Sequence, residues 1–413
     1  MKVAYFSPLP PERSGIADYS VLLLPALSQR IDVVPVGRGQ RAPRGADLRL
    51  YHVGNDAEAH GWIVEELERE PGLVVLHDFV LHHLVAGMTI GRGNGRAYLA
   101  AMEREYGTVG RLLGHGVLDQ RIPMLWELRP EQFPLSAGIL SLATGLVVHS
   151  RYVERRAREI GFAGPIWRVP HPAWPPPAEL PPHGLPPGRS PVVGCFGNLN
   201  PTKRVPQLLQ AFARLRERFP EALLVLAGAP APRFRLDERL DRLGLLGSDA
   251  VARFDYVDEG LLWALLAASD VCAGLRSPTM GETSGVAIRA LSLGRPLVVS
   301  DVGWFSELPD SAAAKVPVDE WEVDTLAAVL ERMGEDRGLR EAMGAAGRAY
   351  TEREHDLERV AEGYAAALEE AAGGAQVRER VLAEVAAAAA AAGLAADGPE
   401  LADIGARLRE VGL

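Results

Sequence analysis

The residues best suited to chemistry lie in the segment RSPTMGETSGVAIRALSLGRPLVVSD, residues 276–301. A polar turn with a single acid, Glu282, precedes Thr283, Ser284 and Gly285, which are typical of a helix start. The free N–H groups and positive dipole end of such a helix suit a phosphate. Glu282 is placed to accept hydrogen bonds from hydroxyls, so the segment predicts a ligand with phosphate and sugar-like parts. The alternative is an ordinary helix capped by Thr283 or Ser284.

A second candidate is the stretch GNLNPTKR, residues 197–204, which follows a predicted strand and leads into a helix. Lys203 lies near the start of that helix, where an ammonium and the helix dipole together would hold a diphosphate. The chain has only three lysines against 41 arginines, so a lysine here needs a local reason. The alternative is a solvated surface charge.

His77 and Asp78 follow the apolar strand in VVLHDFVLHH, residues 74–83, at its carboxyl end. Ligands bind at that end of the strands in doubly wound sheets. The spacing matches no standard zinc motif, so we predict that His77 makes a polar contact to a substrate; helix capping is the alternative. Gly15 opens a helix directly after the first strand, and it indicates either a ligand-binding loop or a tight turn that needs glycine.

The composition limits the function classes. The 413 residues carry a net charge of −10, which arises entirely in residues 186–413, and this argues against a general nucleic-acid binder. No window approaches the roughly 20 apolar residues of a membrane span, and the first residues lack the apolar run of a signal peptide. The two cysteines form no zinc motif, so we expect a cytoplasmic protein without a metal.

Strands and helices alternate along most of the chain, which predicts an α/β protein with doubly wound parallel sheets. Residues 170–191 hold ten of the 31 prolines and predict an extended connector between two such domains. We expect five parts: a domain over 1–170, a connector over 171–191, a domain over 192–347, a crossover helix over 348–372 and a helical tail over 373–413.

Arginines are concentrated on one predicted helix, at positions 151, 155, 156 and 158. This pattern is consistent with a solvated helix face or with contact to an anionic membrane surface.

Together these motifs resemble the retaining GT-B glycosyltransferases of the family-4 type, over roughly residues 1–372. The resemblance implies two Rossmann-like domains that face each other across a cleft. The nucleoside-diphosphate sugar donor would lie mainly on the C-terminal domain, and the acceptor, a sugar, glycolipid or polysaccharide, mainly on the N-terminal one.

The resemblance also implies roles for individual residues. Lys203 would bind the donor diphosphate, together with Gly197 and backbone N–H groups of Thr283, Ser284 and Gly285. Glu282 would be the first acid of the family's E-x7-E motif and contact the transferred sugar. Gly15 would approach the diphosphate from across the cleft, and His77 and Asp78 would lie near the transferred sugar.

Two departures from the family pattern stand out. Asn198 takes a position where the family often has an arginine, and Arg276 or Arg204 is expected to supply the charge. Eight residues beyond Glu282 stands Ala290 in place of the second acid, which usually holds the nucleotide ribose. If the loop is one residue shorter, Arg289 takes that place.

The implied reaction is transfer of a sugar to an acceptor hydroxyl with retention of anomeric configuration, without a metal or other cofactor. The catalytic group would comprise Glu282, His77 and Lys203. Bacterial polysaccharide or glycolipid synthesis is the expected setting. The alternatives are a nucleotide-sugar-binding protein without turnover, and a donor epimerase or hydrolase on the same fold.

Overall fold

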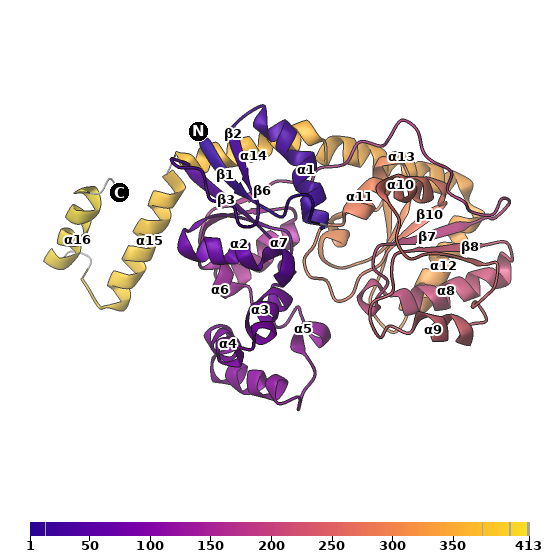
Figure 1. The fold of residues 1–413 in the computed structure, drawn as a ribbon, viewed down its shortest axis with the longest axis horizontal. Coiled ribbons are helices and arrows are strands. Elements are labelled where there is room, and N and C mark those ends of the chain that lie inside the picture. Colours follow the sequence, from indigo (N-terminus) through magenta and orange to yellow (C-terminus); the bar gives the residue numbers. More distant parts are fainter. Residues whose placement is uncertain (13, 374, 396–397, 411–413) are drawn as a thin grey trace.

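Two parallel β-sheets, each of six strands, organise the chain (Figure 1). The computed structural model describes residues 1–12, 14–373, 375–395 and 398–410. The α/β class and the parallel sheets predicted from strand–helix alternation are confirmed. We call the part from β1 to β6 the first unit and the part from β7 to β12 the second unit.

The first unit has the strand order β2-β1-β3-β4-β5-β6. Helices cover both faces of this parallel sheet, and its central strand Gly72–Leu76 is accordingly apolar and buried throughout. The strands are β1 (Lys2–Phe6), β2 (Asp32–Val36), β3 (Leu48–Val53), β4 (Gly72–Leu76), β5 (Ala143–Val148) and β6 (Ile166–Arg168). The helices are α1 (Gly15–Ser28), α2 (Ala57–Arg69), α3 (His82–Thr89), α4 (Gly95–Leu118), α5 (Leu125–Leu128), α6 (Ala137–Leu140) and α7 (Arg151–Glu159), with a 3₁₀ turn at Ile90–Arg92.

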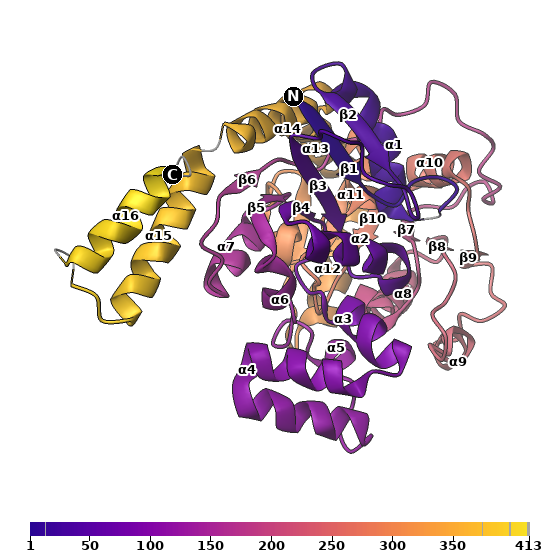
Figure 2. The same ribbon diagram turned by 60° about the vertical axis from the view of Figure 1, so that its left-hand side comes forward.

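A helical extension formed by α3, α4 and α5 projects from the first unit between β4 and β5 (Figures 1 and 2). Two further short helices, α5 and α6, lie between β4 and β5. Both are single turns, too short to show a helical period in the sequence.

The second unit has the strand order β12-β11-β10-β7-β8-β9. The strands are β7 (Val192–Phe196), β8 (Leu223–Ala227), β9 (Val251–Phe254), β10 (Val271–Gly274), β11 (Leu297–Ser300) and β12 (Ala313–Val316). The helices are α8 (Val205–Arg218), α9 (Leu236–Arg242), α10 (Glu259–Ala268), α11 (Gly285–Ser292), α12 (Glu322–Glu335) and α13 (Arg337–Glu354), with 3₁₀ turns at Pro201–Lys203 and Gly303–Glu307.

Two segments connect the units. Residues 170–191 contain neither helix nor strand. After α13, helix α14 (Leu357–Ala372) begins at the N-cap Asp356 and runs back over the first unit, where it packs against α1. The buried hydroxyls of Tyr19 and Tyr364 share a hydrogen bond of 2.7 Å at this contact.

The last helices, α15 (Ala375–Ala391) and α16 (Pro399–Glu410), extend away from both sheets (Figure 2). Within the described ranges, no helix is long and apolar enough to cross a membrane.

Candidate functional site

Loops at the carboxyl ends of strands from both units enclose a cavity of about 740 Å³, which we call the cleft cavity. A smaller pocket of about 230 Å³, the inner pocket, adjoins it on the second unit. Both are lined by Glu282, Thr283, Gly285 and Val286, so the start of α11 separates them. The segment with the strongest sequence signal therefore lies at the junction of the two spaces.

The N-terminus of α11 is the common wall of both spaces. Ser284 is the N-cap residue, and its side chain accepts a hydrogen bond of 3.2 Å from Ala287 N. The buried Thr283 Oγ1 has no hydrogen-bond partner among the described residues. The segment is thus a capped helix, and it also presents an unpaired hydroxyl and a helix dipole to the two spaces.

Two cationic side chains line the inner pocket beside this helix start, Lys203 and Arg276. Lys203 Nζ donates a hydrogen bond of 2.5 Å to Phe196 O. Burial, followed by the nearby Arg276 charge, lowers the pKa of Lys203 to about 8. Gly197 adopts a left-handed φ of 81°, and a Cβ there would collide with Lys203 Nζ. The left-handed backbone favours glycine at this position, and its missing side chain leaves room for the lysine ammonium.

Arg204 and Asn198 lie apart from this pair. The Arg204 guanidinium is engaged by the buried carboxylate of Glu322, with an Nε–Oε1 distance of 2.8 Å. Asn198 is exposed, and neither residue belongs to the lining of the cleft cavity or the inner pocket. Of the two arginines considered for the missing charge, the structure favours Arg276.

Glu282 is held in place by its own loop. Its Oε1 forms an ion pair of 2.6 Å with Arg276 Nε. Its Oε2 accepts hydrogen bonds from Thr279 Oγ1 at 3.0 Å and Met280 N at 2.8 Å. A carboxylate has about four lone-pair sites, so Glu282 keeps capacity for a further donor from a ligand.

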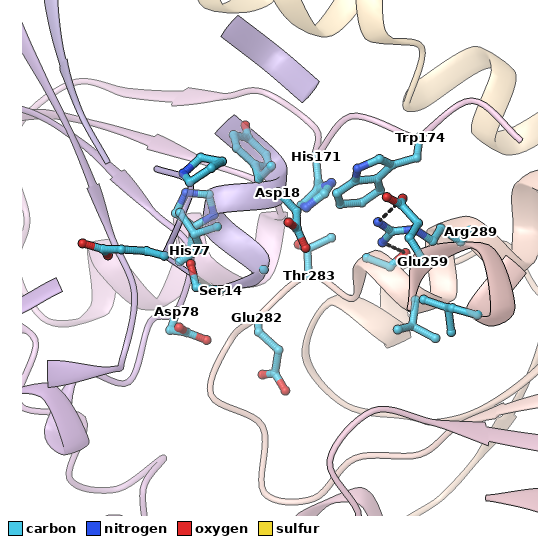
Figure 3. A pocket seen from close by; sticks show the side chains of 18 of the residues that line it. Ser14, Asp18, His77, Asp78, His171, Trp174, Glu259, Glu282, Thr283 and Arg289 are labelled. Carbon is cyan, nitrogen blue, oxygen red and sulfur yellow. Dashed lines mark hydrogen bonds and ion pairs between the residues drawn. The ribbon is translucent and has the colours of Figure 1, made fainter. Parts of the chain in front are cut away.

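The first unit contributes the opposite wall, with Ser14, Gly15, His77 and Asp78 among its lining residues (Figure 3). Gly15 is the first residue of α1, and a Cβ there would have no atom within 4 Å. Its φ is not left-handed. No tight turn therefore requires this glycine, and the space in front of it is open to a ligand.

His77 belongs to a buried histidine cluster. Its Nε2 lies 3.0 Å from His52 Nδ1. Burial, with the neighbouring His149 next, places the pKa of His77 well below its ordinary value. His77 is therefore a neutral hydrogen-bonding group, suited to a substrate hydroxyl and not to proton transfer at neutral pH. Within the part of the chain that the structure describes, no group of three or more His, Cys, Asp or Glu side chains is arranged to hold a metal ion.

Asp78 and Glu282 are carboxylates from different units that both line the cleft cavity (Figure 3). Burial, followed by the charge of Glu282, raises the pKa of Asp78 to about 7. Asp78 Oδ2 accepts a hydrogen bond of 2.9 Å from Asn55 N. The folded protein thus favours the protonated form of Asp78 more than the unfolded chain does.

Arg289 and Ala290 occupy different faces of α11. Ala290 is fully buried and lines only the inner pocket, whereas Arg289 lines the cleft cavity. The Arg289 guanidinium carbon lies 3.5 Å from the centre of the Trp174 ring, and Nη2 is 3.2 Å from Glu259 Oε1. Of the two positions, only Arg289 therefore lines the cleft cavity.

Several lining residues were not singled out from the sequence. They are Asp18, His149, His171, Trp174, Tyr256 and Glu259. His149 directly follows β5, just as His77 directly follows β4. This position at the carboxyl end of a strand could have identified His149 from the sequence. Trp174 comes from the proline-rich connector, which has no period that could predict its position.

The arginine-rich helix α7 is only partly solvated. Arg156 lies 4.9 Å from the centre of the Phe79 ring and donates a hydrogen bond of 2.9 Å to Glu131 O. Arg151, Arg155 and Arg158 remain exposed. Arg156 is therefore not part of a solvated helix face, because the cation–π contact with Phe79 holds it inward.

Two facing parallel α/β units with a site between their strand ends define a GT-B-like architecture, and solved structures support this class. Sucrose-phosphate synthase from Thermosynechococcus elongatus superposes with a TM-score of 0.64 at 18% identity, covering 91% of this chain and all of that one. HepE from Anabaena, in complex with UDP and glucose, gives a TM-score of 0.55 at 16% identity over 90% of this chain. At these identities the likeness concerns the fold.

Residues 178–350 match the family described as "Glycosyl transferases group 1", so the chain carries such a domain. A GDP-mannose-dependent monoacylated alpha-(1-6)-phosphatidylinositol monomannoside mannosyltransferase from Corynebacterium glutamicum is 31% identical over 182 residues. A D-inositol 3-phosphate glycosyltransferase from Kribbella flavida is 32% identical over 164 residues. These matches span 45% and 38% of the two relatives, and 42% and 38% of this chain.

Proposed function

We propose that this protein transfers a glycosyl group from a nucleoside-diphosphate sugar to an acceptor hydroxyl with retention of anomeric configuration. One observation carries the proposal: the inner pocket, with Lys203, Arg276 and the start of α11, adjoins the cleft cavity, whose lining includes Glu282 and His77. Cations and free N–H groups suit the diphosphate, and the polar walls suit sugar hydroxyls.

In the proposed reaction, the bond between the anomeric carbon and the diphosphate oxygen breaks. The acceptor oxygen bonds to the same carbon on the face that the diphosphate leaves, and the acceptor proton passes to the departing diphosphate. Negative charge develops on the leaving group, where Lys203, Arg276 and the N–H groups of α11 would stabilise it. Glu282 and His77 would hold the sugar's hydroxyls. In this proposal the positive charges of Lys203 and Arg276, and not a metal ion, neutralise the diphosphate.

The matched relatives supply the substrate classes to test. One is named for GDP-mannose and a phosphatidylinositol mannoside, and the other for D-inositol 3-phosphate. We propose an acceptor of the sugar, inositol or glycolipid class in bacterial glycolipid or polysaccharide synthesis, at the cytoplasmic side of a membrane. The exposed arginines of α7 would allow peripheral contact with that surface.

The test compares two lysines. We expect Lys203→Ala to reduce kcat/KM on the order of 10²–10³-fold, the usual loss for a charge-stabilising group. Lys315→Ala is the matched control. Lys315 lies on β12, where it pairs with Asp310, and it lines neither the cleft cavity nor the inner pocket. Donors are GDP-mannose and UDP-glucose, acceptors are inositol phosphates and mannosylated phosphatidylinositols, and product anomers are assigned by NMR.

Equal activity of the two lysine variants would refute the assigned site. A product of inverted configuration would refute the mechanism.

A second candidate is a donor-binding protein without turnover, favoured by the absence of a carboxylate at both Arg289 and Ala290. It predicts donor binding without release of nucleotide for any acceptor in the panel. A hydrolase or epimerase would instead consume the donor, or change its sugar, when no acceptor is present.

A further inference from the structure

Glu259 and Arg289 form a fixed charged pair on the second-unit wall of the cleft cavity (Figure 3). The Glu259 side chain is 62% exposed, and the Arg289 side chain only 9%. Arg289 lies flat against Trp174 and donates a weak 3.4 Å hydrogen bond to Gly285 O. The arginine is thus immobilised by stacking, and it holds the carboxylate while leaving it open to the cavity.

Glu259 also lies at the start of a helix. Glu259 is the first residue of α10, whose N-cap Asp258 accepts a hydrogen bond of 2.8 Å from Leu261 N. The positive end of a helix stabilises acidic side chains in its first turn. With Arg289 on one oxygen, the carboxylate retains lone pairs for two adjacent hydroxyl donors.

The charged pair also lies at a suitable distance from the start of α11, where the phosphates are proposed to bind. Arg289 lies four residues after Gly285 on α11, one turn or about 6 Å along the axis. A nucleoside diphosphate with its phosphates at that helix start would place its ribose near the Glu259–Arg289 pair. The exposed Tyr256 and the apolar Leu262 line the same wall and offer a surface for the base.

We propose that Glu259 accepts hydrogen bonds from the ribose hydroxyls of the donor nucleotide, and that Arg289 is the positioning residue for its carboxylate. This inference rests on the proposed function, since it takes the nucleotide to bind at α11. It assigns recognition of the ribose to Glu259 of α10. Arg289 of α11 acts only by positioning Glu259.

The experiment measures binding of UDP, GDP and ADP, each with its 2′,3′-dideoxy counterpart, by calorimetry. We expect wild-type protein to prefer the ribonucleotide by about tenfold, the scale of hydrogen bonds to a charged group. Glu259→Ala should lose this preference with unchanged affinity for the dideoxynucleotide. The control is Glu217→Ala, an exposed glutamate of α8 away from both spaces.

The positioning role of Arg289 is tested by the ribose preference of its own variants. Arg289→Met should lower the ribose preference, Arg289→Lys should restore part of it, and adding Arg289→Met to Glu259→Ala should have no further effect. An intact preference in Glu259→Ala overturns the inference, even if the acceptor's KM rises. If the wild-type protein binds none of the three nucleotides, the proposed function fails with it.

Discussion

Single side chains in the cleft derive their chemistry from burial and from neighbours on other elements. Lys203 and Asp78 have pKa values of about 8 and about 7, each displaced towards neutrality chiefly by desolvation. In an uncharacterised cleft such displaced groups are candidates for function. Neither displacement is visible in the local sequence, because Arg276 and Glu282 reach these groups from distant segments.

Relative to wild type, the Asp78→Asn variant should be more stable at pH 8 than at pH 5. The folded-state pKa of Asp78 is raised, so the unfolded chain loses this proton first, and wild-type stability falls as pH rises from about 4 to about 7. Asparagine does not ionise and can still accept the hydrogen bond from Asn55 N. We expect the Tm gap between variant and wild type to grow by about 2 °C or more over this range.

Scanning calorimetry at several pH values checks this expectation. Asp241→Asn, at an exposed position of α9, is the control. A gap that does not change with pH would show that Asp78 ionises normally in the folded protein.

At the scale of elements, α14 is placed by its contact with α1. Tyr364 packs in a cluster with Val360, Leu368 and the α1 residue Leu23. The Tyr19–Tyr364 hydrogen bond lies inside this apolar contact. Burial of the two hydroxyls is tolerable only because each satisfies the other.

Tyr364→Phe should therefore destabilise the protein by about 1–3 kcal/mol, because it leaves the Tyr19 hydroxyl buried without its partner. Tyr19→Phe should act similarly, and the double variant should be close to wild type. Denaturant unfolding measures these free energies, with Tyr256→Phe, whose residue is 76% exposed, as the control. Additive losses in the double variant would contradict the pairing.

At the scale of the whole molecule, the two units are also joined by contacts close to the site. Phe79 N and Val80 N of the first unit donate to Met280 O at 2.7 and 2.9 Å. Glu307 of the second unit accepts from Arg151 N at 3.0 Å and Tyr152 N at 2.6 Å, so it caps α7 across the boundary. Loops of the second unit thereby hold the cleft in the described arrangement.

Glu307→Ala should loosen this boundary. The first N–H groups of α7 would lose their acceptor, and removing a cap typically costs about 1 kcal/mol. We expect faster hydrogen exchange in the segment 150–156, whereas Glu352→Ala, at an exposed position of α13, should leave it unchanged. Unaltered exchange in Glu307→Ala would show that the contact does not hold the units together.

The sequence by itself determined the α/β class, the parallel sheets and the capped start of α11, because apolar periodicity and capping are local properties of the chain. It also placed Lys203, Glu282 and His77 after strands, and the carboxyl ends of parallel strands share one edge of a sheet. Short elements such as α5 and β12 were not predicted, since a single turn or four residues carry too little pattern.

Only the tertiary structure decided which charges meet. It engaged Arg204 with Glu322, brought Arg276 to Lys203, and set Glu259 of α10 against Arg289 of α11 and Trp174 of the connector. The partners of long side chains depend on how segments far apart in sequence pack together, and no local sequence pattern determines them. An acid beside Arg289, Glu259 of the neighbouring helix, is thus seen only in the folded chain.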